Sequence, residues 1–414
     1  MQETAYLSAL AGLLHDVGKF AVRAGELGSR TWDDEGRRDY GYYHALLTAD
    51  FIERYVPAAW RVAAKVAAGN HHRPQGPGDR VVTIADRLSA GERADVTEDA
   101  RAAQPRQLLS IFCSATADGL SAPGDAYWPL VPLRVNRATL FPGPAGNDEA
   151  AWGAYRRLWD DFTREAGQLR DAHSAAPDLP VYVESLLLLM QRYTWCMPSA
   201  YYRKRPDISL YDHNRTTAAL AAVLSDAGFG DDQLSRLARE PEAAGETLAL
   251  LVGGDLSGVQ DFIYTISARG AASALRGRSF YLQMLGEAVA RYILRRLDLP
   301  ATNLIYAGGG NFYLLVRPGD RERLAAAQRA ISRVMLGHHR GDLYLALAAR
   351  PLAGRDFFEG RISGVWSALG EELQRAKQQR FAELGPSWQT SSRRKATAAT
   401  RKASARCAAA RIRA

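Results

Sequence analysis

The stretch LLHDVGKF, residues 13–20, sets His15 beside Asp16 at the end of an apolar run and follows them with a glycine and a lysine. The residues before it, TAYLSALAGLL at 4–14, repeat apolar side chains at helical spacing. We therefore expect the pair at a helix end, where an imidazole and a carboxylate from adjacent residues can bind one metal ion. Whether they do depends on the other ligands that the region supplies.

The residues that follow predict an all-helical N-terminal domain over residues 1–100. Apolar stripes at helical spacing run through YYHALLTADFIERYV (42–56) and AAWRVAAKVAAG (58–69), and the second stripe ends at a Gly-Asn stop signal. The segment PGDRVVTIADRLSAGER (77–93) restarts the helical pattern after a Pro/Gly turn.

This region also concentrates possible metal ligands. Four of the eight histidines and two carboxylates form the expected ligand set, which comprises His15, Asp16, His44, His71, His72 and Asp86. Imidazoles mixed with carboxylates suit Mn, Fe, Co, Ni or Zn. Taken singly, the residues indicate less: His44 could be a satisfied core histidine, and Asp86 a solvated helix residue.

The order His-Asp, His, His-His, Asp on short helices resembles the HD metal-dependent phosphohydrolase superfamily. The resemblance implies that a metal-activated water attacks phosphorus, with two metals stabilising the attacking and leaving oxygens. It makes His15 and Asp16 catalytic, together with Lys19, which follows one turn later and could hold a phosphate oxygen. The expected cofactor is a divalent metal, with Mn, Ni, Co or Mg as candidates.

The remaining chain indicates a second, mixed domain, so the expected fold class is α+β. Residues 101–245 read as a mostly helical connecting region, with helices in 184–200 and in TTAALAAVLSDAGF (216–229), the latter with a possible threonine cap. Residues 246–350 follow the order β-α-β-β-α-β of the ferredoxin-like fold. Polymerase and cyclase palms use this arrangement, and so do many binding modules.

The net charge of +8 resides in the C-terminal tail. Residues 391–414 hold eight Lys or Arg and no acidic residue, which leaves 45 basic and 45 acidic residues in 1–390. The tail has no aromatics and no apolar stripe, so we expect it to be disordered or to be an out-of-frame end. Three widely spaced cysteines suit a reducing cytoplasm. We expect no membrane span and no secretory signal, because an apolar run of about 18 residues and a basic N-terminal region are both missing.

Longer motifs resemble one family closely. GDLSGVQDFIYTISARGAASALRGRSFYLQ (254–283) and YAGGGNFYLL (306–315), together with LLHDVGKF, GNHHRP, ADRLSAGER and PDISLYDHNRTTAA, resemble the large subunit of type III-A (Csm) CRISPR effector complexes. The resemblance covers residues 1 to about 385. It implies a subunit for antiviral defence whose partners are other Csm subunits, guide RNA and target RNA. It also implies an HD nuclease that cuts single-stranded DNA on target-RNA binding, and two palms that make cyclic oligoadenylate from ATP.

The chain departs from this family in the residues that nucleotidyl transfer needs. The resemblance implies that the family's first palm is similarly degenerate and that a second palm, with a Gly-Gly-Asp-Asp turn, is catalytic. The hairpin turn Gly308–Asn311 has no carboxylate, so Asp255 in the first strand is the acidic residue left for a two-metal site. No Gly-Gly-Asp-Asp turn of a second palm follows, and residues 351–390 read as the start of a truncated linker. We therefore expect a truncated or frameshifted chain that makes no cyclic oligoadenylate.

A nucleotide half-site could persist in this palm, with ATP as a possible ligand. Its expected residues are Asp255, Ser257, Gly258, Arg276, Arg278 and Gly309. The two arginines flank a glycine before a predicted helix, and a helix N-terminus with basic residues can seat a phosphate. Alternatively, these glycines only permit tight strand-to-helix turns. His213, in the motif DISLYDH, is interpreted as a packing or domain-bracing residue.

Three functions remain open from the sequence. The first is a metal-dependent single-stranded DNA nuclease in an RNA-guided complex. The second is an HD phosphohydrolase that acts on small nucleotides, against which the palm-like half counts. The third is a non-catalytic truncated subunit that binds metal but does not assemble.

Overall fold

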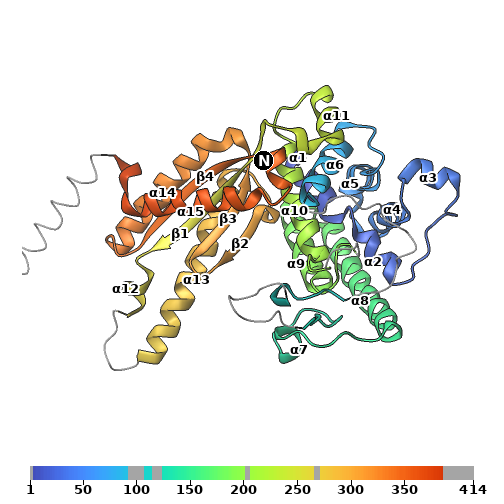
Figure 1. The fold of residues 1–414 in the computed structure, drawn as a ribbon, viewed down its shortest axis with the longest axis horizontal. Helices are drawn as coiled ribbons and strands as arrows, with labels where there is room; N and C mark the ends of the chain where they lie inside the picture. The colour runs from blue at the N-terminus through green and yellow to red at the C-terminus, as the bar shows by residue number, and fades with distance from the viewer. Residues whose placement is uncertain (1–2, 92–106, 114–123, 201–205, 265–270, 386–414) are drawn as a thin grey trace, which may run out of the picture.

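The computed structural model describes residues 3–91, 107–113, 124–200, 206–264 and 271–385. The expected basic tail and the expected domain boundary at residue 100 lie outside the described residues. A helical half, built from the N-terminal residues, packs beside a half that contains a four-stranded sheet (Figure 1).

The N-terminal part is helical, as the sequence predicts. Its helices are α1 (Glu3–Leu14), α2 (Val17–Arg23), α3 (Asp34–Tyr40), α4 (Tyr43–Tyr55), α5 (Ala58–Gly69) and α6 (Pro77–Ser89). The apolar positions of the first helix face inward, so Leu10, Leu13 and Leu14 are fully buried. The predicted stop of α5 is confirmed, because Asn70 caps that helix at its C-terminal end.

The helix is interrupted at His15 and Asp16, between α1 and α2, so the apolar stripe does not continue as one helix. The Thr48 hydroxyl on α4 holds this break, because it accepts a hydrogen bond from the Gly18 amide (3.0 Å) and donates one to the His15 carbonyl (2.9 Å). Gly18 permits the close approach of α2 and α4, since a Cβ at this position would lie 1.8 Å from the His44 carbonyl oxygen. The break therefore holds the His-Asp pair next to the start of α4.

The helices of the connecting region are α7 (Arg137–Leu140), α8 (Asp148–Ala175), α9 (Leu179–Thr194), α10 (Leu210–Leu224) and α11 (Asp231–Arg239). The last four pack onto the N-terminal helices. Helix α10 packs against α1 and α6, and the Asn214 amide donates a hydrogen bond to the Leu13 carbonyl (3.1 Å). The predicted threonine cap is wrong: α10 begins earlier, and the Ser209 hydroxyl accepts a hydrogen bond from the Asp212 amide (2.9 Å). This earlier start brings His213 into the helix.

The other half has the ferredoxin-like arrangement that the sequence predicts, so a helical N-terminal half is followed by a half with a mixed α and β composition, which confirms the α+β class. Its elements are β1 (Thr247–Ser257), α12 (Val259–Tyr264), α13 (Ala271–Arg296), β2 (Leu304–Gly308), β3 (Asn311–Val316), α14 (Arg321–His339), β4 (Tyr344–Ala353) and α15 (Ile362–Gln378). The antiparallel strands lie in the order β2-β3-β1-β4. Helix α15 packs against β1 and β4, so residues beyond 350 belong to the same packed body.

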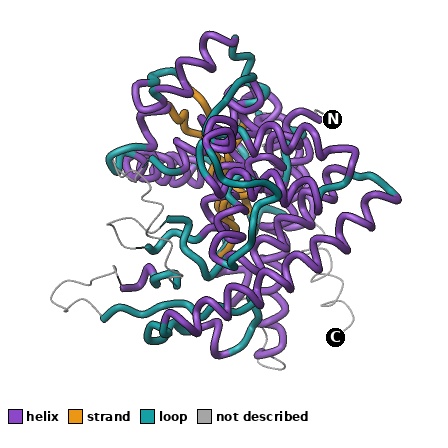
Figure 2. Tube along the Cα trace, turned by 90° about the vertical axis from the view of Figure 1, so that its right-hand side faces the viewer, coloured by secondary structure: helices purple, strands orange, loops and turns teal. Residues whose placement is uncertain are grey.

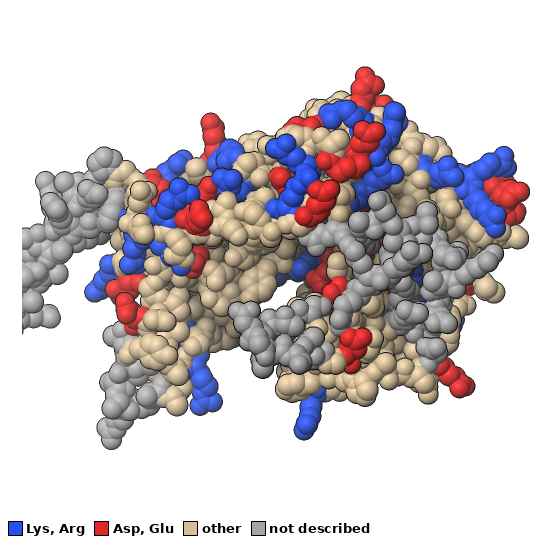
Figure 3. Space-filling view, in the orientation of Figure 1, with Lys and Arg blue, Asp and Glu red and all other residues tan. Residues whose placement is uncertain are grey.

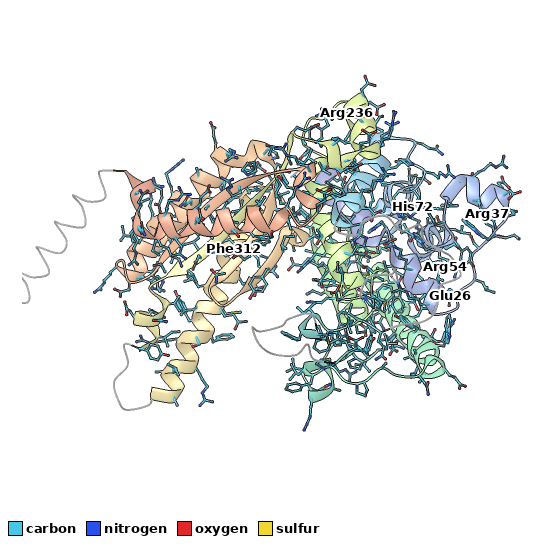
Figure 4. All side chains as sticks on the ribbon, viewed as in Figure 1. Glu26, Arg37, Arg54, His72, Arg236 and Phe312 are labelled. Atoms are coloured by element: carbon cyan, nitrogen blue, oxygen red, sulfur yellow. The ribbon has the colours of Figure 1, made fainter. Side chains whose placement is uncertain are left out.

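Helices cover both faces of the sheet, and Figure 2 shows the strands enclosed by them. On β1, Leu250 and Val252 belong to the core shared with α13 and α14, whereas Leu251 belongs to the core shared with α10 and α15. Gly254 on the same strand makes room for a buried ring, because a Cβ there would lie 2.1 Å from Cζ of Phe312 (Figure 4). Among the described helices, none combines the length and apolar composition that crossing a membrane requires.

Candidate metal centre

The ends of several helices meet inside the helical half and place histidines and carboxylates together. The residues concerned are His15 and Asp16 at the break after α1, His44 at the start of α4, His71 and His72 after α5, Asp86 near the end of α6, and His213 at the start of α10. Figure 4 labels His72 within this half, far from Phe312 of the sheet. All six expected ligands therefore lie in one cluster, and a seventh residue joins them.

Asp16 lies at the centre of this cluster and is 1% exposed. Its Oδ2 atom is 3.3 Å from Nε2 of His213 and 3.5 Å from Nε2 of His15. Its Oδ1 atom is 3.4 Å from Nε2 of His44 and 4.0 Å from Nε2 of His71. The two carboxylate oxygens therefore face different histidines, so Asp16 could serve as a ligand on either side of the cluster.

The possible ligand atoms form two groups, in each of which all atoms lie within 4.8 Å of one another. The first group comprises His15, Asp16, Asp86 and His213, and the second comprises His44, His71 and His72. In the first group, Oδ1 of Asp86 lies 3.1 Å from Nε2 of His213 and 3.3 Å from Nε2 of His15. In the second, Nε2 of His44 and Nε2 of His72 are 3.0 Å apart.

Backbone contacts fix the tautomers of the buried histidines. Nδ1 of His15 lies 2.8 Å from the Gly12 carbonyl, and Nδ1 of His71 lies 2.6 Å from the Ala68 carbonyl. A carbonyl only accepts, so each neutral ring carries its proton on Nδ1 and leaves a lone pair on Nε2. Both Nε2 atoms are buried and hydrogen-bond to no described residue. Such buried lone pairs, aimed at a carboxylate, fit a divalent cation of borderline softness.

The Ser89 hydroxyl orients the ring of His213. Its hydroxyl donates to the His213 carbonyl (3.2 Å) and lies 2.8 Å from Nδ1 of the same residue. A hydroxyl that has donated its proton accepts the next bond, so Nδ1 carries the ring proton. Nε2 of His213 therefore faces Asp16 and Asp86 with its lone pair, in the same way as the two histidines held by carbonyls.

The electrostatics of the cluster favour carboxylates over imidazolium ions. Burial disfavours the charged form of Asp16, but Lys19, and after it His15 and His213, hold the pKa of this carboxyl well below its usual range. Burial, followed by repulsion from His15, lowers the pKa of His71 to about 4. His15 differs: burial opposes its protonation, yet Asp16 and Asp86 outweigh burial and raise its pKa. Negative charge is therefore concentrated between the rings, where a cation is attracted.

Lys19 lies beside the cluster and contacts Asp16, with Nζ 2.8 Å from Oδ2. In this structure its ammonium neutralises a buried carboxylate. Their Coulomb attraction is stronger in this poorly hydrated site than it would be in water. The expected contact between Lys19 and a phosphate oxygen stays a prediction.

His213 is the site residue that sequence reasoning missed. The interpretation of His213 as a packing or bracing residue is incomplete, because it is buried and also contributes Nε2 to the first ligand group. A signal existed: HNRTTAALAAVL is an apolar helix that buries a histidine and an asparagine in its first turns. Buried polar side chains need partners, and the sequence did not say which residues would supply them.

The palm residues of the expected half-site are only partly brought together. Asp255 on β1 faces Asn311 on β3 and forms an ion pair with Lys377 of α15. Gly258 adopts a positive φ of 87° where the chain leaves β1, and a Cβ there would lie 1.9 Å from the Asp342 carbonyl oxygen. Gly309 takes a positive φ of 61° in the hairpin turn. These glycines are thus required by backbone geometry, as the alternative interpretation holds.

The expected placement of Arg276 and Arg278 before a helix is wrong. Helix α13 begins at Ala271, so both arginines lie inside it and not at its N-terminal amides. Arg278 donates a hydrogen bond to the Phe262 carbonyl and stacks over the Phe262 ring, 5.1 Å from its centroid. Arg276 is exposed. In the described part of the palm no contact joins either arginine to Asp255, so the helix-terminus phosphate seat is absent there.

Comparison with known families agrees with the two halves. Residues 2–91 match the HD domain family, and residues 248–392 match the family described as Csm1 subunit domain B. The second match includes α15, which packs on the sheet.

Relatives and solved structures extend the similarity over most of the chain. A CRISPR system single-strand-specific deoxyribonuclease Cas10/Csm1 (subtype III-A) from Methanocaldococcus jannaschii is 28% identical, over 90% of this chain and 50% of its own length. The protein of the same description from Enterococcus italicus is 33% identical, over 89% of this chain and 50% of its own length. The crystal structure of an apo Csm1-Csm4 cassette matches with a TM-score of 0.69 and 25% identity, over 93% of this chain and 49% of the matched chain. The chain thus spans about half the length of the curated relatives it matches.

Proposed function

We propose that the HD site of this chain is a metal-dependent nuclease for single-stranded DNA. The chain is a homologue of the Cas10/Csm1 proteins of CRISPR subtype III-A, with an HD domain and a Csm1 B domain. The relatives are described as single-strand-specific deoxyribonucleases, which supports this substrate. The arrangement of two ligand groups around Asp16 carries the proposal. A carboxylate that faces both groups would suit hydrolysis of a phosphodiester assisted by two metal ions.

The residues of the chain divide the work of such a site. His15, His213 and Asp86 would hold one ion, and His44, His71 and His72 the other, with Asp16 between them. Bound divalent ions, for which we propose Mn, Ni, Co or Mg, would lower the pKa of water and stabilise the charge that develops on phosphate oxygens. Gly12, Ala68 and Ser89 orient the rings from behind, and Lys19 keeps Asp16 ionised.

The wider role is proposed from the same relatives. Solved structures described as Csm1-Csm4 cassettes support assembly with a Csm4-like subunit. Guide RNA, target RNA that activates cleavage, and a cytoplasmic location complete the proposed setting. Free, buried Cys113 and Cys196 suit a reducing compartment. Cassettes solved with one ATP or with AMPPNP favour residual nucleotide binding at the palm, although the altered position of Arg276 and Arg278 counts against a phosphate seat there.

The experiment compares cleavage of a labelled single strand by the purified chain and by the double variant His15→Ala/Asp16→Ala, with Mn²⁺ and with EDTA. We expect no cleavage by the double variant above the EDTA background, because two ligands of one ion are removed. The control is His338→Ala, an exposed histidine in the palm, which should cut at the wild-type rate. Equal cutting by the double variant would refute the assignment, and hydrolysis of mononucleotides but not of DNA would favour the small-nucleotide phosphohydrolase.

A further inference from the structure

A cavity opens beside the second ligand group and reaches a helix outside the HD family match. Its volume is about 460 Å³, within the range of small-ligand sites. His71, His72 and Asp86 form its inner end, and Arg80, Arg87 and Arg239 lie along its wall. Arg239 is the last residue of α11, which packs against α6. The connecting region thus completes the entrance to the metal centre.

The wall of this cavity carries three arginines, of which one is paired with a carboxylate of the described residues. Arg80 forms an ion pair with Asp231, but within the described part of the chain neither Arg87 nor Arg239 has an ion-pair partner. Arg87 instead donates a hydrogen bond to the Arg239 carbonyl (2.8 Å), which holds the two residues side by side. On the face shown in Figure 3, basic and acidic side chains are otherwise interspersed. Two guanidinium groups that pair with no carboxylate of the described residues, next to the proposed metal centre, are suited to phosphate oxygens.

Tyr42 supplies an aromatic surface on the same cavity. The residue is 40% exposed and precedes α4. Its ring stacks on His44 at 5.6 Å between centroids and lies 4.4 Å from the ring of His72. These contacts fix the orientation of the ring, and the exposed part can stack on a base, as aromatic side chains do in single-strand binding sites.

We propose that Arg87 and Arg239 bind the backbone phosphates of a single DNA strand and that Tyr42 stacks on one of its bases, so that the cavity guides an unpaired strand to the metal centre. This proposal rests on the proposed nuclease function and names the residues that seat its substrate. A base inside a duplex cannot expose its face to Tyr42, because it is stacked and paired. The preference for single strands then arises at the cavity.

The test measures binding in EDTA, where neither metal nor cleavage contributes. Fluorescence anisotropy of a labelled single DNA strand gives the affinity of each protein across a salt series. The proteins are the full chain and its variants Arg87→Gln/Arg239→Gln, Tyr42→Ala and Tyr42→Phe. Each lost phosphate contact should reduce the slope of log affinity against log salt by about 0.7. Tyr42→Ala should weaken binding at least about fivefold, whereas Tyr42→Phe keeps the ring and should bind like the wild type.

The control is Arg236→Gln, on the same helix α11 but paired with Glu246 and not among the cavity-lining residues (Figure 4). This variant should bind the strand with the affinity and the salt slope of the wild type. Unchanged binding by the double arginine variant, or a loss equal to that of Arg236→Gln, would overturn the proposal even if the protein cuts DNA. Mn²⁺ affinity, measured by titration calorimetry on the same variants, should stay at the wild-type value. A fall would mean that the substitutions act through the neighbouring ligands His44, His72 or Asp86 and not on the strand, and would overturn the proposal.

Discussion

The ability of the histidines around Asp16 to bind a cation depends on the hydrogen bonds that the other nitrogen of each ring makes. Each ring that faces Asp16 from α1, α5 or α10 is held from behind by a carbonyl or a hydroxyl. These contacts select the tautomer in which Nε2 is free to bind a cation. Ser89 is the one side chain among them that a substitution can remove without touching a ligand.

Ser89→Ala should therefore weaken metal binding while leaving the fold intact. The variant removes the acceptor for Nδ1 of His213, and losing such an outer contact lowers metal affinity by about 10- to 100-fold. Calorimetric titration with Mn²⁺ measures the affinity, and a thermal melt checks the fold. Ser225→Ala, at the other end of α10, is the matched control. A wild-type affinity in Ser89→Ala would show that the ring of His213 needs no such support.

At this scale the sequence predicted six of the seven clustered residues. Adjacent His15 and Asp16, and adjacent His71 and His72, were visible because nearby short helices bring their own ends together. His213 was not, since it comes from a helix far along the chain whose docking depends on tertiary contacts such as that between Asn214 and Leu13. Spacing rules describe one element at a time and cannot give the contacts between distant ones.

Elements decide the chemistry of the palm as well as that of the HD site. The hairpin was predictable from two apolar runs around a glycine turn, and the ferredoxin-like arrangement from the element order, and the observed strand order fits that arrangement. The start of α13 was not predictable, because Gly277 inside a helix reads as a stop in the sequence. The prediction therefore placed Arg276 and Arg278 before a helix, whereas the structure places them inside it.

The hairpin also limits what this palm can do. Asp255 on β1 is paired with Lys377, and its β3 neighbour is Asn311, so a second carboxylate is missing where two cations would need it. We expect the 414-residue chain to make no cyclic oligoadenylate when it is incubated with ATP and Mg²⁺ or Mn²⁺. Mass spectrometry of the products is the measurement. Cyclic product that disappears in Asp255→Ala would mean that one palm assembles the site alone or as a homodimer.

Across the whole molecule, the two halves share one apolar core that continues from α1 to the sheet. Helix α10 joins them: it brings His213 to the ligand cluster, and the carbonyl of Ala219 accepts a hydrogen bond from Asn303 (3.1 Å) beside β2. The proposed metal centre thus depends on the packed chain and not on the residues matched by the HD family alone. His213 is the residue on which this dependence can be tested.

The most direct measurement determines Mn²⁺ binding and single-strand cleavage on the same preparations of the wild type and of His213→Ala. We expect the variant to lose Mn²⁺ affinity and cleavage together, because one ligand group loses a nitrogen that no other described residue replaces. A melting temperature close to that of the wild type without metal would show that the fold survives. Wild-type binding and cleavage by a folded His213→Ala protein would contradict the claim, and would return His213 to the packing role that its sequence first suggested.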